Sequence, residues 1–127
     1  MEISSKNYIQ TMKIILYSKN DFNFTAKLTK ICDLNLDTII FLDKYETLEK
    51  YKGYKNLIIL IDFLDLNNNF ESSIKKIKKI SNFTTCLLFD KIESNLHKKA
   101  TNLGYDIIIS KSNYLMNYKI IKEQLDV

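Results

Sequence analysis

Hydrophobic residues in this chain recur in short runs, separated by longer segments in which they follow helical spacing. The most marked run, residues 57–61, holds five consecutive apolar side chains and ends at Asp62. A strand that is apolar on both alternations is typical of the centre of a parallel sheet with helices on both faces. The run is too short to cross a membrane. The pattern therefore predicts a buried central strand with a carboxylate at its carboxyl end.

Four further apolar runs predict the remaining strands, at residues 13–17, 38–42, 85–89 and 107–109. Each run is followed by an amphipathic segment whose apolar residues recur every three or four positions, as on one face of a helix. The last of these helices is expected over residues 113–125. The apolar stripes are Phe24, Leu28 and Ile31; Tyr45, Leu48 and Tyr51; Phe70, Ile74, Ile77 and Ile80; Ile92, Leu96, Ala100 and Leu103; and Tyr114, Tyr118, Ile121 and Leu125.

Capping residues mark the expected ends of these helices. Asn20 or Asp21 can cap the first one, because a short polar side chain accepts a hydrogen bond from the first turn. Three later starts carry a polar residue followed three positions on by glutamate, which is the spacing of a capping box. These pairs are Asp43 with Glu46, Asn68 with Glu71, and Asp90 with Glu93. Helix ends are expected at Gly53 and Gly104.

Strand and helix alternate five times, which predicts one parallel sheet with right-handed crossovers. The expected fold class is α/β: a five-stranded parallel sheet in the order 2-1-3-4-5, in a flavodoxin-like (βα)5 three-layer sandwich. At 127 residues the chain is long enough for one domain with a proper core. We expect that domain over residues 12–127, after a flexible lead-in at residues 1–11.

The composition excludes several classes of protein. Hydrophobic residues make up 46% and charged residues 27%, which argues against disorder. The net charge of +4 is spread along the chain and forms no arginine-rich stripe of the kind that binds nucleic acid. Cys32 and Cys86 have no metal-binding spacing, so we expect buried free thiols, as in a cytoplasmic protein. No catalytic triad order, phosphate-binding loop or metal-ligand cluster occurs, so the sequence indicates neither an enzyme nor a cofactor.

Two features of the sequence resemble the receiver domain of bacterial response regulators, the CheY-like family. Residues 104–111, Gly-Tyr-Asp-Ile-Ile-Ile-Ser-Lys, are similar to the segment in which a glycine ends the fourth helix and the fifth strand delivers an invariant lysine, here Lys111. Asp62 stands where the family has its phosphoacceptor aspartate. The resemblance covers residues 12–127, and it implies a cytoplasmic protein of two-component signal transduction.

The resemblance also implies a chemistry for which most residues are missing. In the family, the aspartate accepts a phosphoryl group beside a Mg²⁺ ion, and a hydroxyl and the lysine bind the phosphoryl oxygens. Here Asp62 and Lys111 are the two positions of that set that match. The others are degenerate: Tyr17 and Ser18 replace the acidic pair, Phe89 the hydroxyl residue, Ile108 the aromatic switch residue, and Ser112 the proline after the lysine.

Two interpretations of the remaining pair stay open. In one, Asp62 still accepts phosphate at a non-standard metal site with Asp21, Asp65 or Asp90 as substitute ligands. In the other, which we favour, Lys111 pairs with Asp62 at the sheet edge and no phosphate is transferred, because a lysine partner stabilises a partly buried carboxylate without a metal.

The resulting hypothesis is a pseudo-receiver that acts as a phosphorylation-independent protein interaction module. Receivers commonly bind partners, or a second copy, through the face of the fourth helix, fifth strand and last helix. An output domain outside this chain would be needed for nucleic-acid binding, and the sequence does not decide whether there is one. A small flavodoxin-like enzyme or nucleotide binder is disfavoured, because no phosphate loop follows the first strand. The residues expected on the interaction face are His97, Lys98, Tyr105, Tyr118 and Lys119.

Overall fold

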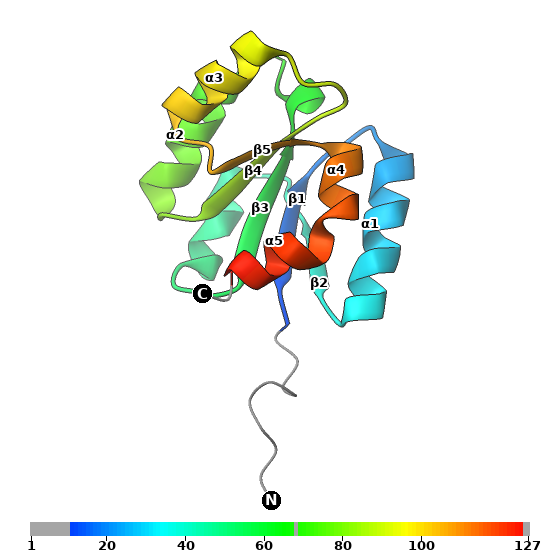
Figure 1. The fold of residues 1–127 in the computed structure, drawn as a ribbon. Coiled ribbons are helices and arrows are strands. Elements are labelled where there is room, and N and C mark those ends of the chain that lie inside the picture. The colour runs from blue at the N-terminus through cyan, green and yellow to red at the C-terminus, as the bar shows by residue number, and fades with distance from the viewer. Residues whose placement is uncertain (1–10, 68, 126–127) are drawn as a thin grey trace, which may run out of the picture.

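The computed structural model describes residues 11–67 and 69–125, which form an α/β fold around one parallel sheet (Figure 1). All four pairings are parallel, and the strand order is β2-β1-β3-β4-β5. The predicted fold class is therefore confirmed. The predicted lead-in lies outside the described residues except for Thr11. The strands are β1 (Lys13–Tyr17), β2 (Thr38–Phe41), β3 (Leu57–Asp62), β4 (Thr84–Phe89) and β5 (Ile107–Ser110).

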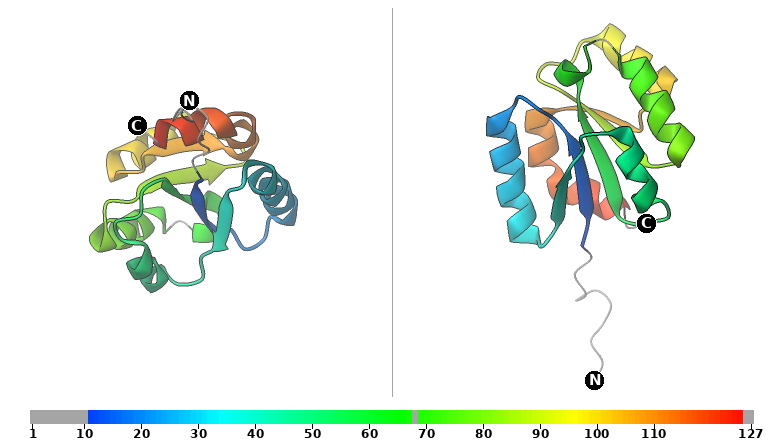
Figure 2. Two further views of the ribbon diagram at one scale, coloured as in Figure 1. Left: turned by 90° about the horizontal axis from the view of Figure 1, so that it is seen from below. Right: turned by 180° about the vertical axis from the view of Figure 1, so that it is seen from behind.

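Helices cover both faces of the sheet and complete a three-layer arrangement (Figure 2). The two apolar clusters that fill the space between sheet and helices share β1, β3 and β4. None of the helices in the described part of the chain is long and apolar enough to span a membrane. One face carries α1 (Phe22–Asn35), α4 (Lys111–Met116) and α5 (Tyr118–Leu125). The other carries the 3₁₀ helix η2 (Tyr45–Tyr51), α2 (Phe70–Ile80) and α3 (Ser94–Leu103), while the short η3 (Phe63–Leu66) follows β3.

The central strand β3 is buried at all six positions. Ile59 and Ile61 belong to the cluster under α2 and η2, and Ile58 and Leu60 to the cluster under α1. Both faces of the strand are covered, so neither alternation can be polar, which accounts for the unbroken apolar run. Each such side chain contributes roughly 1.5–3 kcal/mol by leaving water.

The helix starts follow the capping prediction once and depart from it three times. Asp21 caps α1, since its Oδ1 accepts a hydrogen bond from the amide of Phe24 at 2.9 Å. The three capping boxes were wrong. The residues before η2, α2 and α3 make no side-chain cap bond, and Asn68 lies outside the described residues. The N-cap residues observed there are Lys44, Asn69 and Glu93.

The C-terminal segment is two helices, where the sequence predicted one. The break falls at Asn117, whose side-chain amide donates to the Asn113 carbonyl at 2.8 Å. The backbone of Asn117 leaves the helical region, with φ −105° and ψ 19°, and its side chain bonds the turn that precedes it. The two helix ends predicted at glycine residues are confirmed. Gly104 takes a left-handed φ of 110° as the cap of α3, and Gly53 follows the end of η2 with φ 80°.

A buried carboxylate ties together the amino-terminal edge of the sheet. The Asp37 side chain is fully buried just before β2, and its oxygens accept hydrogen bonds from the backbone amide of Met12 at 2.8 Å and the Tyr118 hydroxyl at 2.5 Å. The ammonium of Lys122 lies 2.8 Å away. One side chain thus joins the starts of β1 and β2 to α5.

We expect the substitution Asp37→Ala to lower the free energy of unfolding by about 3 kcal/mol, because it leaves the Lys122 ammonium without its buried partner. Urea denaturation measures the change. Asp43→Ala serves as the control, since Asp43 is exposed and caps no helix, and it should change stability by less than about 0.5 kcal/mol. Equal effects of the two substitutions on stability would contradict the structural role of the buried Asp37 carboxylate.

Candidate functional site

Asp62 and Lys111 meet at the carboxyl-terminal edge of the sheet. Asp62 is the last residue of β3, and Lys111 follows β5 as the first residue of α4. Asp62 Oδ2 lies 2.8 Å from Lys111 Nζ, and the two residues are 2% and 7% exposed. The expected ion pair is present, and it is buried.

Lys111 contacts two further carboxylates. Its Nζ atom lies 2.9 Å from Asp21 Oδ2 and 2.9 Å from Asp90 Oδ1. The sequence had suggested Asp21 and Asp90 as substitute metal ligands and not as partners of the lysine. The sequence did contain a signal for these contacts with Lys111, namely the positions of the two residues. Asp90 directly follows β4, and Asp21 caps the helix after β1. The carboxyl ends of parallel strands gather such residues at one edge.

The carboxylates keep Lys111 charged. Burial by itself would lower the pKa of this ammonium, but hydrogen bonds to Asp62, Asp21 and Asp90 outweigh burial and raise the pKa above its ordinary value. The pKa of Asp21 is lowered, first by the hydrogen bond from Lys111 and then by the one from the Phe24 amide. The cluster is therefore a set of charges that stabilise one another at neutral pH.

The oxygens of Asp62 accept hydrogen bonds from three separate elements. Oδ1 accepts from the Leu64 amide in η3 at 3.1 Å, and Oδ2 accepts from the Ser18 hydroxyl at 3.0 Å as well as from Lys111. Ser18, which replaces an acidic residue of the receiver pattern, thus donates to the carboxylate. A nucleophilic attack would have to displace these donors.

The residues present do not fit the Mg²⁺ ion that the receiver pattern implies. In the part of the chain that the structure describes, no group of three acidic, histidine or cysteine side chains is arranged to hold a metal. The carboxylates of the edge converge on an ammonium. Asp65, the third suggested substitute ligand, instead accepts from the Lys19 amide at 2.7 Å and the Asn20 side chain at 2.9 Å.

Aromatic packing fills two of the degenerate positions. Phe89 is 2% exposed and stacks on Phe63 with ring centroids 4.6 Å apart. Tyr17 stacks on Tyr45 at 5.8 Å, and the Lys19 ammonium lies 5.1 Å from the centre of the Tyr17 ring. A ring therefore occupies the place of the hydroxyl residue and one of the two places where the pattern requires a carboxylate.

The last two degenerate positions are also structural. Ile108 is half-buried on β5 and packs against the apolar cluster under α2 and α3. Ser112 lies in the first turn of α4, which the Ser110 hydroxyl caps by accepting from the Asn113 amide at 3.2 Å. The chain therefore enters a helix directly at Lys111.

Comparisons with known proteins give structural matches alone. No protein-family profile matches the chain, and no curated protein sequence matches it. A response regulator from Thermotoga maritima superposes with a TM-score of 0.67 at 11% identity, covering 90% of this chain and 99% of that one. The CpaE protein of Burkholderia thailandensis E264, described as a pilus assembly protein, gives 0.66 at 13% identity, covering 89% and 98%. A fusion of the yeast Spc42 trimeric coiled coil to another structure gives 0.70 at 17% identity, covering 93% and 78%.

The chain has the CheY-like receiver fold. At these identities the likeness establishes the fold.

The expected interaction face is only partly exposed. His97 and Lys98 are exposed on α3, as predicted. The prediction was wrong for Tyr105 and Tyr118, which are 3% and 2% exposed. Their hydroxyls donate to buried acceptors, Tyr105 to the Phe70 carbonyl at 2.6 Å and Tyr118 to Asp37, so both are core residues. Lys119 is exposed, but it lines a groove that α4 and α5 form with α1.

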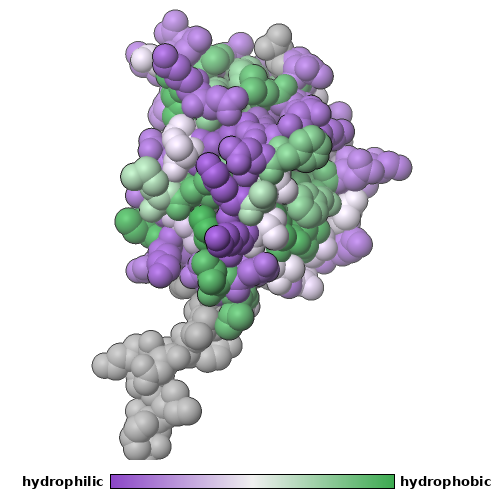
Figure 3. Space-filling model, turned by 90° about the vertical axis from the view of Figure 1, so that its right-hand side faces the viewer, coloured by the Kyte–Doolittle hydropathy of each residue, from purple (hydrophilic) through white to green (hydrophobic). Residues whose placement is uncertain are grey.

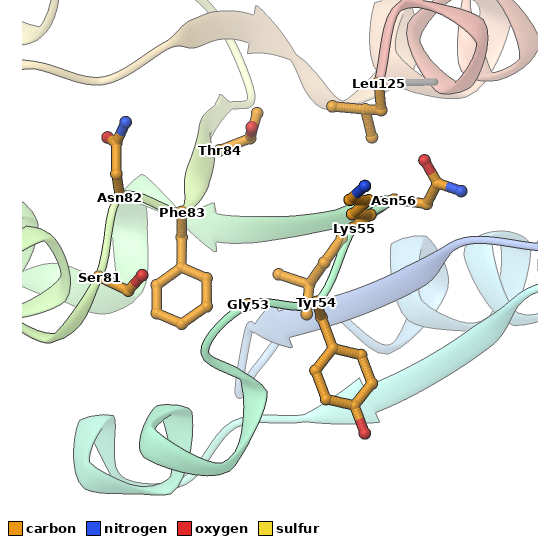
Figure 4. Close-up of a pocket in the computed structure, with 10 residues that line it drawn as sticks. Gly53, Tyr54, Lys55, Asn56, Ser81, Asn82, Phe83, Thr84 and Leu125 are labelled. Atoms are coloured by element: carbon orange, nitrogen blue, oxygen red, sulfur yellow. The ribbon is translucent and has the colours of Figure 1, made fainter. Parts of the chain in front are cut away.

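A cavity of about 520 Å³ lies at the opposite, amino-terminal edge of the sheet (Figure 4). Two loops line it, residues 53–56 before β3 and residues 81–83 before β4, together with Leu125 and the first residue of each strand, Leu57 and Thr84. Lys55 is the one charged residue of this lining. No acid and base face each other across the cavity, so we assign the candidate site to the carboxyl-terminal edge.

We expect Lys111→Met to lower the free energy of unfolding at neutral pH by about 3–5 kcal/mol, because it leaves the buried Asp62 carboxylate without its cation. Lys98→Met is the control, since Lys98 is an exposed lysine of α3, and it should change stability by less than about 0.5 kcal/mol. Chemical denaturation of both variants and the native chain measures the effect. A loss as small as that of the control would contradict a structural role for the ion cluster.

The difference in unfolding free energy between the native chain and Lys111→Met should depend on pH in a defined direction. Asp21 has a lowered pKa in the folded state, so its contribution is present above its ordinary value of 3.8 and is lost as the pH falls through the lower folded value. Lys111 has a raised pKa, so its contribution is present below its ordinary value of 10.5 and is lost as the pH rises through the higher folded value. The gap between native chain and Lys111→Met should therefore be widest between about pH 4 and pH 10 and shrink in stronger acid.

Proposed function

We propose that this chain is a receiver-like regulatory module of bacterial signal transduction that binds protein partners without phosphotransfer and has no enzymatic activity. The observation that carries the proposal is the position of the Lys111 ammonium, within 2.9 Å of three carboxylates. The carboxylates of Asp62, Asp21 and Asp90, two of which were the suggested substitute metal ligands, already pair with a cation of the protein itself. The CheY-like fold supports a role in signalling.

Two independent losses argue against phosphorylation of Asp62. The first loss is the metal ion that would assist the attack. Mg²⁺ requires oxygen ligands in near-octahedral geometry, and the Asp62 oxygens already accept hydrogen bonds from Lys111, Ser18 and the Leu64 amide. The product loses a donor, because Phe89 supplies no hydroxyl for a phosphoryl oxygen. Either loss alone would disfavour the phosphorylated state.

Incubation with acetyl phosphate and Mg²⁺ should leave the intact mass of the native chain unchanged, because the attacking carboxylate has no metal to neutralise the incoming phosphate. Mass spectrometry is the readout, and Asp62→Asn is the matched control. Phe89→Thr alone should remain unmodified as well, because it restores the donor and not the metal site.

A gain of one phosphoryl group on the native chain and not on Asp62→Asn would overturn the proposal. It would establish the alternative function, an active phosphoacceptor at Asp62, and direct attention to Asp21, Asp65 and Asp90 as metal ligands.

The proposed face for a protein partner is α3 with the edge strand β5. His97 and Lys98 are exposed on α3, and β5 is an edge strand of the sheet in the described part of the chain. Charge on the rim of an interface acts mainly on association rate and on its salt dependence. This face therefore suits a partner with acidic groups at the contact.

Charge reversal by Lys98→Glu should weaken capture of such a partner and leave the fold intact, because Lys98 is exposed and forms no ion pair in the described structure. The measurement compares proteins retained from a bacterial extract by the immobilised native and Lys98→Glu chains. Lys55→Glu, at the other end of the molecule, controls for net charge. Identical capture by the native and Lys98→Glu chains would move the interface away from α3.

A further inference from the structure

One wall of the cavity at the amino-terminal edge of the sheet is fastened by a lysine. The Lys78 ammonium donates to the Phe83 carbonyl at 2.6 Å and to Asn82 Oδ1 at 3.3 Å. The same ammonium pairs with Asp106 Oδ2 at 3.0 Å, just before β5. Lys78 therefore holds the loop before β4 against the start of the neighbouring strand.

The opposite wall, the loop before β3, is fixed mainly by its backbone. Gly53 and Asn56 have left-handed φ angles of 80° and 55°. The Asn56 carbonyl accepts from the Lys13 amide at 2.9 Å, and the Lys13 ammonium lies 5.4 Å from the centre of the Tyr54 ring. Two ordered walls make the cavity a preformed site, and a preformed site binds a ligand at a lower entropic cost.

The cavity has the size and the apolar floor of a small-molecule site. Its volume of about 520 Å³ falls within the range of about 300–1,000 Å³ that is typical of such sites. Leu57 and Phe83 line it and are 5% and 6% exposed, and the Phe83 ring points toward the loop of Gly53 (Figure 4). No atom of another segment lies within 4 Å of the β-carbon position of Gly53, so the space beside this loop is open.

The polar groups of the lining are suited to donating hydrogen bonds. Asn82 Oδ1 already accepts from Lys78, which leaves the amide nitrogen of Asn82 as a donor. Ser81 and Thr84 add two hydroxyl groups, each of which can donate. The site therefore favours a ligand that carries hydrogen-bond acceptors.

The charge of the lining is positive. Lys55 is exposed, and in the described part of the chain it forms no ion pair. No aspartate or glutamate is among the described residues that line the cavity. The carboxyl end of α2 points here and brings partial negative charge, which Lys78 and Lys79 in the last turn of α2 offset. An anionic group is therefore favoured over a cationic one.

We propose that this cavity binds a small organic anion, a molecule with one acidic group and a compact apolar body. The acidic group accepts from the Lys55 ammonium and the Asn82 amide, and the apolar body lies on Leu57 and Phe83. The site lies at the opposite edge of the sheet from Lys111. The inference therefore goes beyond the proposed function, and its test does not depend on phosphorylation or on a protein partner.

Titration of the ¹⁵N-labelled native chain with 3-phenylpropanoate, followed by ¹H–¹⁵N NMR spectra, locates the site and gives the dissociation constant. The amide signals of residues 53–57 and 81–84 should shift and saturate in the millimolar range, as expected for so small a ligand. Two matched probes divide the chemistry: 3-phenylpropylammonium has the same body with the opposite charge, and inorganic phosphate has charge without the body. Each should bind at least about tenfold more weakly, a difference of about 1.4 kcal/mol.

The location of the shifts matters because the molecule has a second apolar surface. Leu34 and Leu36 at the end of α1 are 76% and 64% exposed, and Met116 and Ile120 on α4 and α5 are 80% and 57% exposed. Figure 3 views the α1 side and shows hydrophobic surface on both sides of a polar band. Shifts confined to these residues, or no shifts at residues 53–57 and 81–84, would overturn the proposal.

Two lysine variants test the role of charge at the site. Lys55→Gln should weaken binding of 3-phenylpropanoate about tenfold, because it removes the cation of the lining. Lys52→Gln is the matched control, since Lys52 is a nearby lysine that pairs with Glu49 and does not line the cavity, and it should leave the dissociation constant unchanged. Equal effects of the two variants, or equal affinity for 3-phenylpropanoate and 3-phenylpropylammonium, would refute an anion site.

A third variant tests the cavity itself. Ser81→Phe should abolish binding, because a ring at this position fills space that the probe needs. Circular dichroism establishes whether the variant folds. Undiminished binding by a folded Ser81→Phe chain would contradict the proposal, and if this variant does not fold, the comparison of Lys55→Gln with Lys52→Gln decides.

Discussion

The buried ammonium of Lys111 is the interaction on which the carboxyl-terminal edge of the sheet depends. Taking a lysine out of water is costly unless several acceptors surround it. Here three carboxylates do so, and they come from the start of α1, the end of β3 and the residue after β4. The loops that carry them are therefore drawn to one point, and removal of the lysine would leave the buried Asp62 carboxylate without its cation.

This arrangement has a consequence for signalling. A receiver that switches needs a site whose charge changes when a phosphoryl group arrives, because the change in charge moves the loops around it. In this chain the negative charges already meet a cation that belongs to the protein. Phe89 and Phe63 pack beside them in an apolar contact, which leaves no polar group at that position to respond. The ion pairs hold the loops of this edge together, and this arrangement supports the proposal of a receiver-like module without phosphotransfer.

A second ion cluster fixes the opposite edge. Asp37 joins the starts of β1 and β2 to α5 through Met12, Tyr118 and Lys122. Ion pairs thus hold both edges of the sheet, and the exposed surfaces that differ in chemistry lie on the helices. The exposed charged surface of α3 is the side to which we assign a protein partner.

The sequence by itself determined the strands, their order and the meeting of Asp62 with Lys111. Burial on both faces forces residues 57–61 to be apolar, and parallel strands place their carboxyl ends together, so these features follow from local pattern and topology. The ends of the helices were harder to predict from the sequence. Asp90 pairs with Lys111 and caps no helix, and the backbone of Asn117 leaves the helical region between α4 and α5.

Tertiary structure alone decided which polar groups are buried. Tyr105 and Tyr118 were expected on the interaction face, although Tyr118 also belongs to the apolar stripe of the last helix. Inside the fold, the Phe70 carbonyl and the Asp37 carboxylate accept hydrogen bonds from their hydroxyls. Likewise Asp21 and Asp90 could be read as ligands for a metal, and the position of Lys111 makes them partners of an ammonium. A side chain's partner can lie 90 residues away, as Asp21 does from Lys111, and no local pattern encodes that contact.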